Sequence, residues 1–156
     1  MANEKHIEIL NQGVQLWNKW REENPDIIPD LHGANISHSR QFLMNSPDIA
    51  FDFRGVNFRE ANLSNCRFLS PNLHSADLGN AILKNTGLAG AILAYANLRG
   101  ANLTDATLIS VNLRNADICD SNFHNANLIN ADLTGARRDS GTDFTAAKLD
   151  GSIGLV

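Results

Sequence analysis

The chain has 156 residues, with 13 Lys and Arg against 17 Asp and Glu, and a formal charge of −4. Charged residues make up 19% of it, below the ~25% of an average soluble protein, while Asn (20), Leu (19) and Ala (18) are abundant. This length favours one domain, no apolar stretch approaches the ~20 residues of a membrane-spanning helix, and the near-neutral charge argues against nucleic-acid binding.

The first predicted element is an N-terminal helix over residues 4–23, which ends before Asn24 and Pro25. Its apolar stripe has four members at helical spacing: Ile7, Leu10, Val14 and Trp17. A repeat structure cannot bury its own terminal face, so we interpret this stripe as a cap. Residues 1–28 are therefore expected to be an N-terminal capping helix and a linker.

Residues 29–50 are predicted to form an irregular first coil with a loop. Two five-residue units begin it, with centres at Leu31 and Ile36. The next regular centre, Phe53, follows 17 residues later, which is two more than three whole units. We interpret the excess as a bulged loop within residues 39–50.

From residue 51 to residue 135 the sequence repeats every five residues, 17 times without an insertion. The third position is Leu in 12 repeats, the first is Ala in ten, the second is Asn or Asp in 12, and the fifth is Gly, Asn or Asp in 12. On a helix this period would move the apolar position by about 140° each time, and in a continuous strand it would flip successive Leu to opposite faces. The pattern instead predicts a short extended piece, with its first and third residues inward, followed by a bend. Repetition of that bend winds the chain into a solenoid.

These units resemble the pentapeptide-repeat family, as in ANLSN, ADLGN, ANLRG, ANLTD and ADLTG. The resemblance implies an all-β solenoid, namely a right-handed quadrilateral β-helix with one pentapeptide per side, here with an N-terminal α-helical cap. The stretch WNKWREENP ahead of PDL is similar to the start of cyanobacterial members. Departures such as Pro71 at the first position and Arg67 at the second affect single corners only.

The repeat breaks at Ala136–Gly141 and resumes one residue out of phase, with centres at Phe144 and Leu149. Residues 136–156 are therefore expected to contain a loop, two out-of-phase repeats and a C-terminal tail.

The sequence predicts no catalytic residue, no cofactor and no metal site. His74 and His124 are expected to point outward on non-adjacent faces, and no phosphate-binding loop, nucleophile elbow or HExxH motif occurs. Cys66 is expected inside the coil and Cys119 at an outward position, about two and a half coils away and too far for a disulfide. Two free thiols fit a reducing cytoplasm, which is the expected location.

At twenty residues per coil, one outward column reads Leu69, Ala89, Ile109 and Ile129. Beyond Arg67 its flanking columns carry no charge. One interpretation is incidental exposure of single apolar residues, which is normal. The other is an interaction face, with Leu69, Ile109 and Ile129 as contacts, for an unidentified protein partner or for a weak homodimer. A homodimer through the caps is a further alternative, and neither a nucleic acid nor a membrane is an expected partner.

We therefore expect a non-enzymatic protein–protein interaction scaffold. The resemblance to cyanobacterial members implies a role in cyanobacterial regulation, such as heterocyst differentiation. The alternative is gyrase binding by DNA mimicry, as in the quinolone-resistance branch of the family. Residues 51–135 hold seven Asp and Glu against six Lys and Arg, which is far from the acidity that an imitation of DNA phosphates requires.

Overall fold

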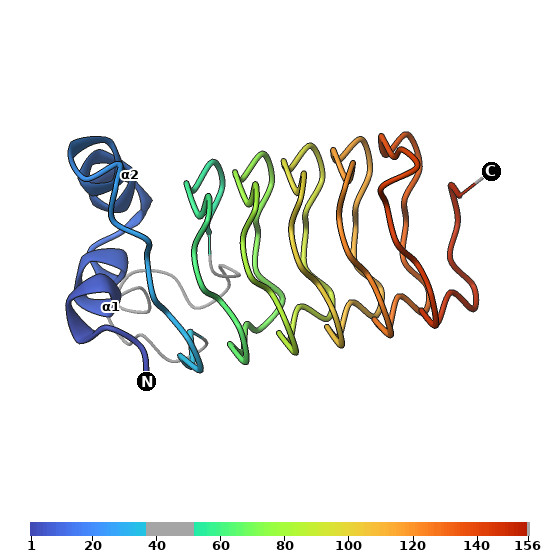
Figure 1. Cartoon of the computed structure of the whole chain (residues 1–156), viewed down its shortest axis with the longest axis horizontal. Helices are drawn as coiled ribbons and strands as arrows, with labels where there is room; N and C mark the ends of the chain where they lie inside the picture. The colour runs from blue at the N-terminus through green and yellow to red at the C-terminus, as the bar shows by residue number, and fades with distance from the viewer. Residues whose placement is uncertain (37–51, 156) are drawn as a thin grey trace.

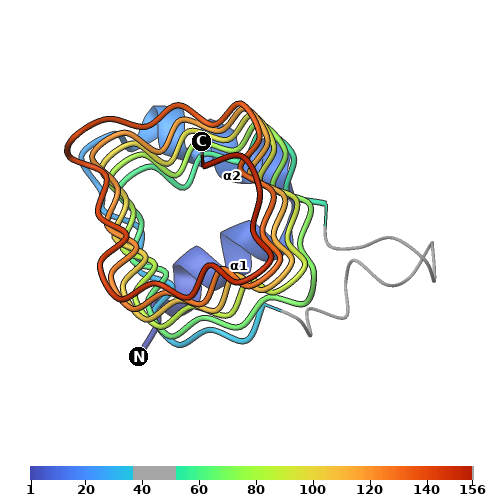
Figure 2. The same cartoon turned by 90° about the vertical axis from the view of Figure 1, so that its right-hand side faces the viewer.

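The computed structural model describes residues 1–36 and 52–155. Two N-terminal helices lie at one end of a stack of coils, and the C-terminus lies at the other end (Figure 1). Viewed down the stack, the coils have a four-sided outline (Figure 2). The predicted loop within residues 39–50 lies outside the described residues.

The N-terminal region contains two helices, α1 (Glu4–Asn11) and α2 (Val14–Glu23). The prediction of a single helix over residues 4–23 is therefore wrong. The break falls at Gly13, whose φ of 108° is incompatible with a helix and is rarely adopted by an L side chain. Because of this break, α1 and α2 cover different parts of the end of the coil stack (Figure 2).

The coils are joined by isolated parallel bridges between residues 20 apart, and the bridged residue is the second of each pentapeptide. One column of such bridges links Asn57, Asp77, Asn97 and Asp117. A separation of 20 residues equals four pentapeptides, so each pentapeptide forms one side of the outline. Within residues 1–36 and 52–155 the extended pieces pair only through these single bridges, rather than through the longer strands of an ordinary sheet.

Backbone hydrogen bonds between coils follow one pattern over most of the stack, with an exception at Asp120, whose N–H donates to Asp139 Oδ1 at 2.9 Å. The second residue donates its N–H backward, as Asp77 does to Val56 O at 2.9 Å. The third donates forward, as Leu78 does to Asn97 O at 2.7 Å. The fifth also donates forward to the fourth-position carbonyl of the next coil. These bonds satisfy the backbone groups that each extended piece would otherwise leave unpaired.

The corners explain the excess of Asn and Asp. At each of the 12 second positions that carry Asn or Asp, the side-chain Oδ1 accepts a hydrogen bond from the backbone N–H two residues later. All 17 fifth positions between residues 55 and 135 have positive φ. Gly, Asn and Asp adopt that conformation at least cost, so they concentrate there.

The interior is filled by the first and third residues of the repeats, which are buried in all the regular coils over residues 52–135. Two first positions are polar, and their hydroxyls donate to backbone carbonyls of the preceding coil. Thr86 Oγ1 donates to Leu63 O, and Ser121 Oγ donates to Leu98 O, each at 2.8 Å. Neither buried hydroxyl is therefore left without a hydrogen-bond partner.

The bridge separation changes at both ends of the stack. Toward the C-terminus it lengthens from 20 residues at Asp117↔Arg137 to 21 at Asn122↔Asp143, which accommodates one extra residue in the last coil. Toward the N-terminus it is 32 residues at both Asp30↔Asn62 and Asn35↔Arg67, which is 12 more than in the regular coils.

Candidate interaction surfaces

One side of the stack, here called the Leu69 face, comprises residues 67–70, 87–90, 107–110 and 127–130. Parallel bridges join Arg67, Gly87, Thr107 and Asn127, so the outward residues of the four coils stand in columns. Arg67 is the only charged residue in these four segments. The structure therefore aligns the predicted column.

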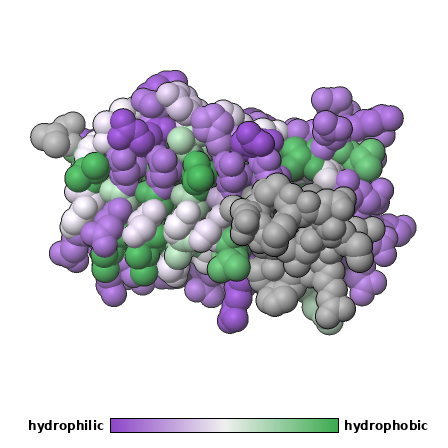
Figure 3. All heavy atoms as spheres, turned by 180° about the vertical axis from the view of Figure 1, so that it is seen from behind, coloured by the Kyte–Doolittle hydropathy of each residue, from purple (hydrophilic) through white to green (hydrophobic). Residues whose placement is uncertain are grey.

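The predicted contacts on this face differ in exposure. The Leu69 side chain is 66% exposed, whereas Ile109 and Ile129 are half-buried between their neighbours. Seen from behind, the surface of the stack shows hydrophobic side chains interspersed among hydrophilic ones (Figure 3). The apolar column is consequently a low ridge rather than a set of projecting side chains.

An adjoining side, here called the Tyr95 face, comprises residues 52–55, 72–75, 92–95, 112–115 and 132–135. Tyr95 is 59% exposed and packs edge-on against the His74 ring, with the two centroids 5.3 Å apart. Two ion pairs flank them: Arg54–Asp52 at 2.6 Å and Arg114–Asp132 at 2.9 Å. The charges of this face are thus balanced locally.

Asp132 is held in its charged form by its surroundings. Hydrogen bonding by the Thr134 side chain and backbone N–H, assisted by Arg114, lowers the pKa of Asp132 to about 2. The side-chain hydrogen bond from Arg54 likewise lowers the pKa of Asp52. Arg99 pairs with Asp120 at 2.5 Å on another side of the stack. Because carboxylates on these sides are paired with Arg, they form no unbroken acidic surface.

At the N-terminal end, α2 supplies side chains where a preceding coil would supply backbone. Trp17 Nε1 donates to Asn57 O at 2.7 Å, the Asn18 Oδ1 accepts from Asn57 N at 2.8 Å, and Arg21 donates to Arg59 O at 3.1 Å. In the regular coils these three backbone groups bond to backbone of the preceding coil. The second-position carbonyl accepts from a third-position N–H, the second-position N–H donates to a first-position carbonyl, and the fourth-position carbonyl accepts from a fifth-position N–H. Three side chains therefore complete the hydrogen bonding of the open edge over residues 57–59.

The same helix packs against the core. Trp17 is fully buried and meets the Phe58 ring edge-on, with centroids 5.6 Å apart. Arg21 is buried too, which lowers the pKa of its guanidinium by desolvation, and its Nε has no hydrogen-bond partner among the described residues. A second bond from Arg21, to Ile27 O at 2.6 Å, ties the helix to the segment that follows it.

Helix α1 and the residue before it make hydrogen bonds to another part of the N-terminal edge. The Asn3 N–H donates to Asp30 O at 3.0 Å, and the Asp30 N–H donates to His6 Nδ1 at 2.9 Å. The latter bond requires an unprotonated Nδ1 on the buried His6 ring. Of the predicted cap residues, Leu10 and Trp17 are buried, while Ile7 and Val14 are half-buried against the core.

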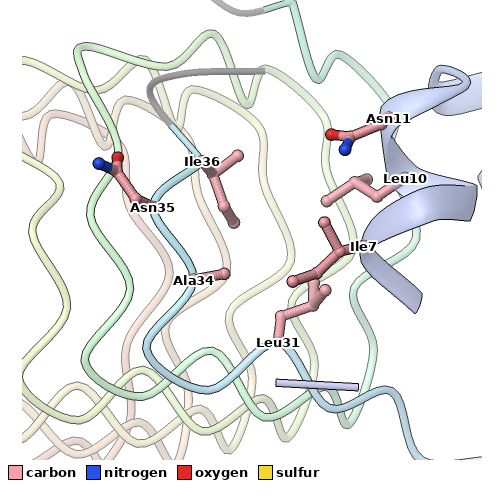
Figure 4. Close-up of a pocket in the computed structure, with 7 residues that line it drawn as sticks. All are labelled: Ile7, Leu10, Asn11, Leu31, Ala34, Asn35 and Ile36. Carbon is pink, nitrogen blue, oxygen red and sulfur yellow. The ribbon is translucent and has the colours of Figure 1, made fainter. Parts of the chain in front are cut away.

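Two hollows lie beside the helices. The first, about 200 Å³, separates α1 from the first coil, and its seven lining residues are Ile7, Leu10, Asn11, Leu31, Ala34, Asn35 and Ile36 (Figure 4). The second, about 450 Å³, lies between the two helices and the segment after α2. It is lined by Asn3, Lys5, His6, Ile9, Trp20, Ile27, Ile28 and Asp30. Neither brings together a set of groups that indicates catalysis.

The described residues contain no group of three or more His, Cys, Asp or Glu arranged to hold a metal ion. Cys66 and Cys119 are both free thiols. Cys119, which was expected at an outward fourth position, is buried, with 5% of its surface exposed. Over the ranges 1–36 and 52–155, no helix has the length and apolar character needed to cross a bilayer.

Several contacts escaped the sequence analysis. Asn18, Arg21 and His6 carry no periodic signal, because their role is to bond one specific backbone group. The contact between His74 and Tyr95 did have a signal, since residues 21 apart in a 20-residue coil are neighbours.

A search for similar proteins identifies the repeat. The family model described as pentapeptide repeats matches in 8 copies, in overlapping segments that together extend from residue 52 to residue 137, more than half of the 156 residues. No curated protein sequence matches the chain.

Solved structures of similar proteins include HetL, a pentapeptide repeat protein involved in heterocyst differentiation regulation from the cyanobacterium Nostoc. It is 25% identical with a TM-score of 0.42, over 80% of this chain and 61% of HetL. The chain therefore spans less than two thirds of HetL. Rfr23, a pentapeptide repeat protein from the cyanobacterium Cyanothece, is 33% identical with a TM-score of 0.36, over 72% of this chain and 79% of that one. QnrB1, a plasmid-mediated fluoroquinolone resistance protein, is 18% identical with a TM-score of 0.42, over 65% of this chain and 66% of that one. With its family model matched over more than half of its length, the chain belongs to the pentapeptide-repeat family.

Proposed function

We propose that the protein is a non-enzymatic interaction scaffold that binds another protein chain through the Leu69 face. The observation that carries this proposal is the aligned column of Leu69, Ile109 and Ile129, on a side with no charge beyond Arg67. Exposed apolar residues in a continuous row favour association more than scattered ones do. The family's members are generally structural or interaction proteins, which is consistent with this function.

The proposal extends to the architecture that presents the face. We infer that the coil is a right-handed quadrilateral β-helix and that α1 and α2 act as its N-terminal cap. The 20-residue bridge separation, the four-sided outline and the side-chain hydrogen bonds from Trp17, Asn18 and Arg21 support this inference. A cytoplasmic role in cyanobacterial regulation, such as heterocyst differentiation, is the process we infer from the sequence resemblance. Gyrase binding is not favoured, because Arg residues pair with four carboxylates of the described coils, and these carboxylates therefore form no unbroken acidic row there: Asp52, Asp117, Asp120 and Asp132.

The test is affinity capture from the native host with two matched triple variants. In the first, Leu69, Ile109 and Ile129 are replaced by Lys. In the control, three outward apolar residues of other sides are replaced by Lys instead: Ile82, Ile92 and Tyr95. We expect proteins captured by the unchanged chain to be lost with the first variant and retained with the control, by quantitative mass spectrometry. Equal capture by both variants would remove the Leu69 face from the proposal.

A further inference from the structure

We propose that the second hollow, of about 450 Å³ beside the two helices, binds a free α-amino acid with an apolar side chain. This inference is independent of the proposed use of the Leu69 face, because the hollow shares no residue with that face. Its lining residues come from α1 and the N-cap of that helix, from α2 and from the segment after α2. Small-molecule sites usually measure about 300–1,000 Å³, so the hollow has room for such a ligand.

One polar side chain in the wall of the hollow has a fixed orientation. His6 is only 7% exposed, and its Nδ1 accepts a hydrogen bond from the Asp30 N–H at 2.9 Å. A neutral ring whose Nδ1 is an acceptor carries its proton on Nε2. This Nε2–H has no acceptor among the described residues, and Nε2 is not one of their fully buried unpaired atoms. Because His6 lines the hollow and little of it is exposed elsewhere, the Nε2–H is a donor available to a ligand there.

The first turn of α1 favours a carboxylate in the same place. Asn3, which is the N-cap of α1, and Lys5 both line the hollow. The N-terminus of a helix carries a partial positive charge, and its first N–H groups lack partners within the helix. The Lys5 ammonium adds a full positive charge and makes no ion pair with any residue over 1–36 and 52–155. Glu4 lies in the same turn but does not line the hollow.

Asp30 supplies the opposite charge. One of its carboxylate oxygens accepts from the His32 N–H at 3.0 Å, and no cation of the described chain pairs with it. Asp30 and Lys5 therefore line one hollow without neutralising each other through an ion pair. A ligand that carries both a carboxylate and an ammonium complements both charges, whereas a fatty carboxylate or an alkylamine complements only one.

The rest of the hollow is apolar. Ile27 and Ile28 are 42% and 65% exposed, and Ile9 and Trp20 are half-buried. The Trp20 ring packs against the His6 ring, with centroids 5.0 Å apart, so this part of the wall is well defined. An apolar ligand side chain would cover this surface, which favours a branched or aromatic amino acid over a polar one. Because the ligand is small and the isoleucines are open to solvent, we expect a dissociation constant on the order of 0.1–1 mM.

The experiment titrates three ligands that share one apolar group into the ¹⁵N-labelled full chain and follows the NMR signals. L-leucine carries both charges, 4-methylpentanoate lacks the ammonium, and 3-methylbutylamine lacks the carboxylate. The backbone amides of Lys5 and Ile28 and the indole N–H of Trp20 report on the hollow. We expect L-leucine to shift these signals and to bind at least about fivefold more tightly than either analogue.

Matched variants assign the two charges. Asp30→Asn keeps the oxygen that accepts from His32 and removes the charge, so it should weaken L-leucine at least about threefold and 4-methylpentanoate not at all. Lys5→Met should weaken both of these ligands. The controls Asp26→Asn and Lys19→Met make the same changes at exposed positions outside the hollow, and they should bind L-leucine as the unchanged chain does.

Three results would overturn the proposal. The first is that these signals do not move with L-leucine up to about 10 mM, which is well above the expected dissociation constant. The second is that either analogue binds as tightly as L-leucine, and the third is that the control variants lose as much affinity as Asp30→Asn and Lys5→Met. None of these results bears on the Leu69 face, which affinity capture tests separately.

Discussion

Inside the coil stack, Asp77 donates its backbone N–H to Val56 O of the preceding coil at 2.9 Å, whereas at the N-terminal edge Asn57 donates the equivalent N–H to the Asn18 side chain at 2.8 Å. The interior and the N-terminal edge satisfy the same backbone group by different means. In the interior, the partner is another backbone group and is independent of sequence. At the edge, the partner is one particular side chain on α2.

This difference predicts different tolerance to mutation. An interior repeat retains its inter-coil hydrogen bonds when an outward residue changes, since those bonds join backbone to backbone. Trp17, Asn18 and Arg21 each occur once, and no neighbouring repeat can replace the bond that is lost. Substitutions in this set should therefore reveal whether the helices stabilise the stack as a cap.

The largest effect is expected for Trp17→Ala. This change removes a fully buried ring from its contact with Phe58 and leaves the Asn57 carbonyl without its donor. Loss of a buried aromatic residue costs about 3–5 kcal/mol of unfolding free energy. Urea unfolding measures this cost, and Leu16→Ala, which truncates a side chain that is 49% exposed, is the matched control. Equal stability of the two variants would contradict a capping role for α2.

Arg21→Met should have the next largest effect. It keeps an apolar stem but removes the donors to Ile27 O and Arg59 O. Hydrogen bonds from a charged group contribute about 1.5–3 kcal/mol, partly offset here because a buried guanidinium is no longer desolvated. The control is Lys19→Met, which breaks only an exposed pair with Glu23 at 3.8 Å and should change stability by less than about 0.5 kcal/mol. A gain in stability for Arg21→Met would show that desolvation outweighs the two bonds.

Asn18→Asp separates the two bonds that this side chain makes. The carboxylate still accepts from the Asn57 N–H, but it cannot donate to Gly55 O, to which the amide donates at 2.8 Å. We expect a loss of about 1–2 kcal/mol in thermal or urea unfolding at neutral pH, from one unpaired carbonyl and its repulsion of the carboxylate. The neighbouring Gln15→Glu makes the same chemical change at an exposed site and should leave stability nearly unaltered. If both variants unfold alike, the Gly55 bond contributes nothing.

The sequence was informative where one structural rule applies many times. Its five-residue period predicted the family, the inward first and third positions and the turn role of Asn and Asp, because each repeat imposes the same burial and corner geometry. It was least informative where a contact occurs once. The break at Gly13 was missed because the apolar stripe continues on both sides of it, and one glycine does not by itself end a helical pattern.

The surface shows the same limit. The 20-residue coil placed Leu69, Ile109 and Ile129 in one column from the sequence alone. It could not show that Ile109 and Ile129 are half-buried, or that Cys119 is covered, because exposure depends on the neighbours in adjacent coils. Bonds such as the one from Asp30 N–H to His6 Nδ1 likewise depend on how α1 is placed against the first coil.

The smallest effect is expected for Asp132→Asn, the reverse exchange at an interior corner. Asn at this position keeps the Oδ1 that accepts the Thr134 N–H, as other Asn do at second positions, so stability at neutral pH should fall only slightly, through loss of the partly exposed pair with Arg114. The pKa of Asp132 is lowered to about 2 in the folded chain, below its ordinary value of 3.8. The stabilisation from its charged form is therefore present above pH 3.8 and is lost as the pH falls toward about 2. The thermal unfolding temperature should accordingly fall less steeply between pH 5 and pH 2 for Asp132→Asn than for the unchanged chain. If the two chains show parallel curves of unfolding temperature against pH, the interaction with Thr134 and Arg114 does not favour the charged form.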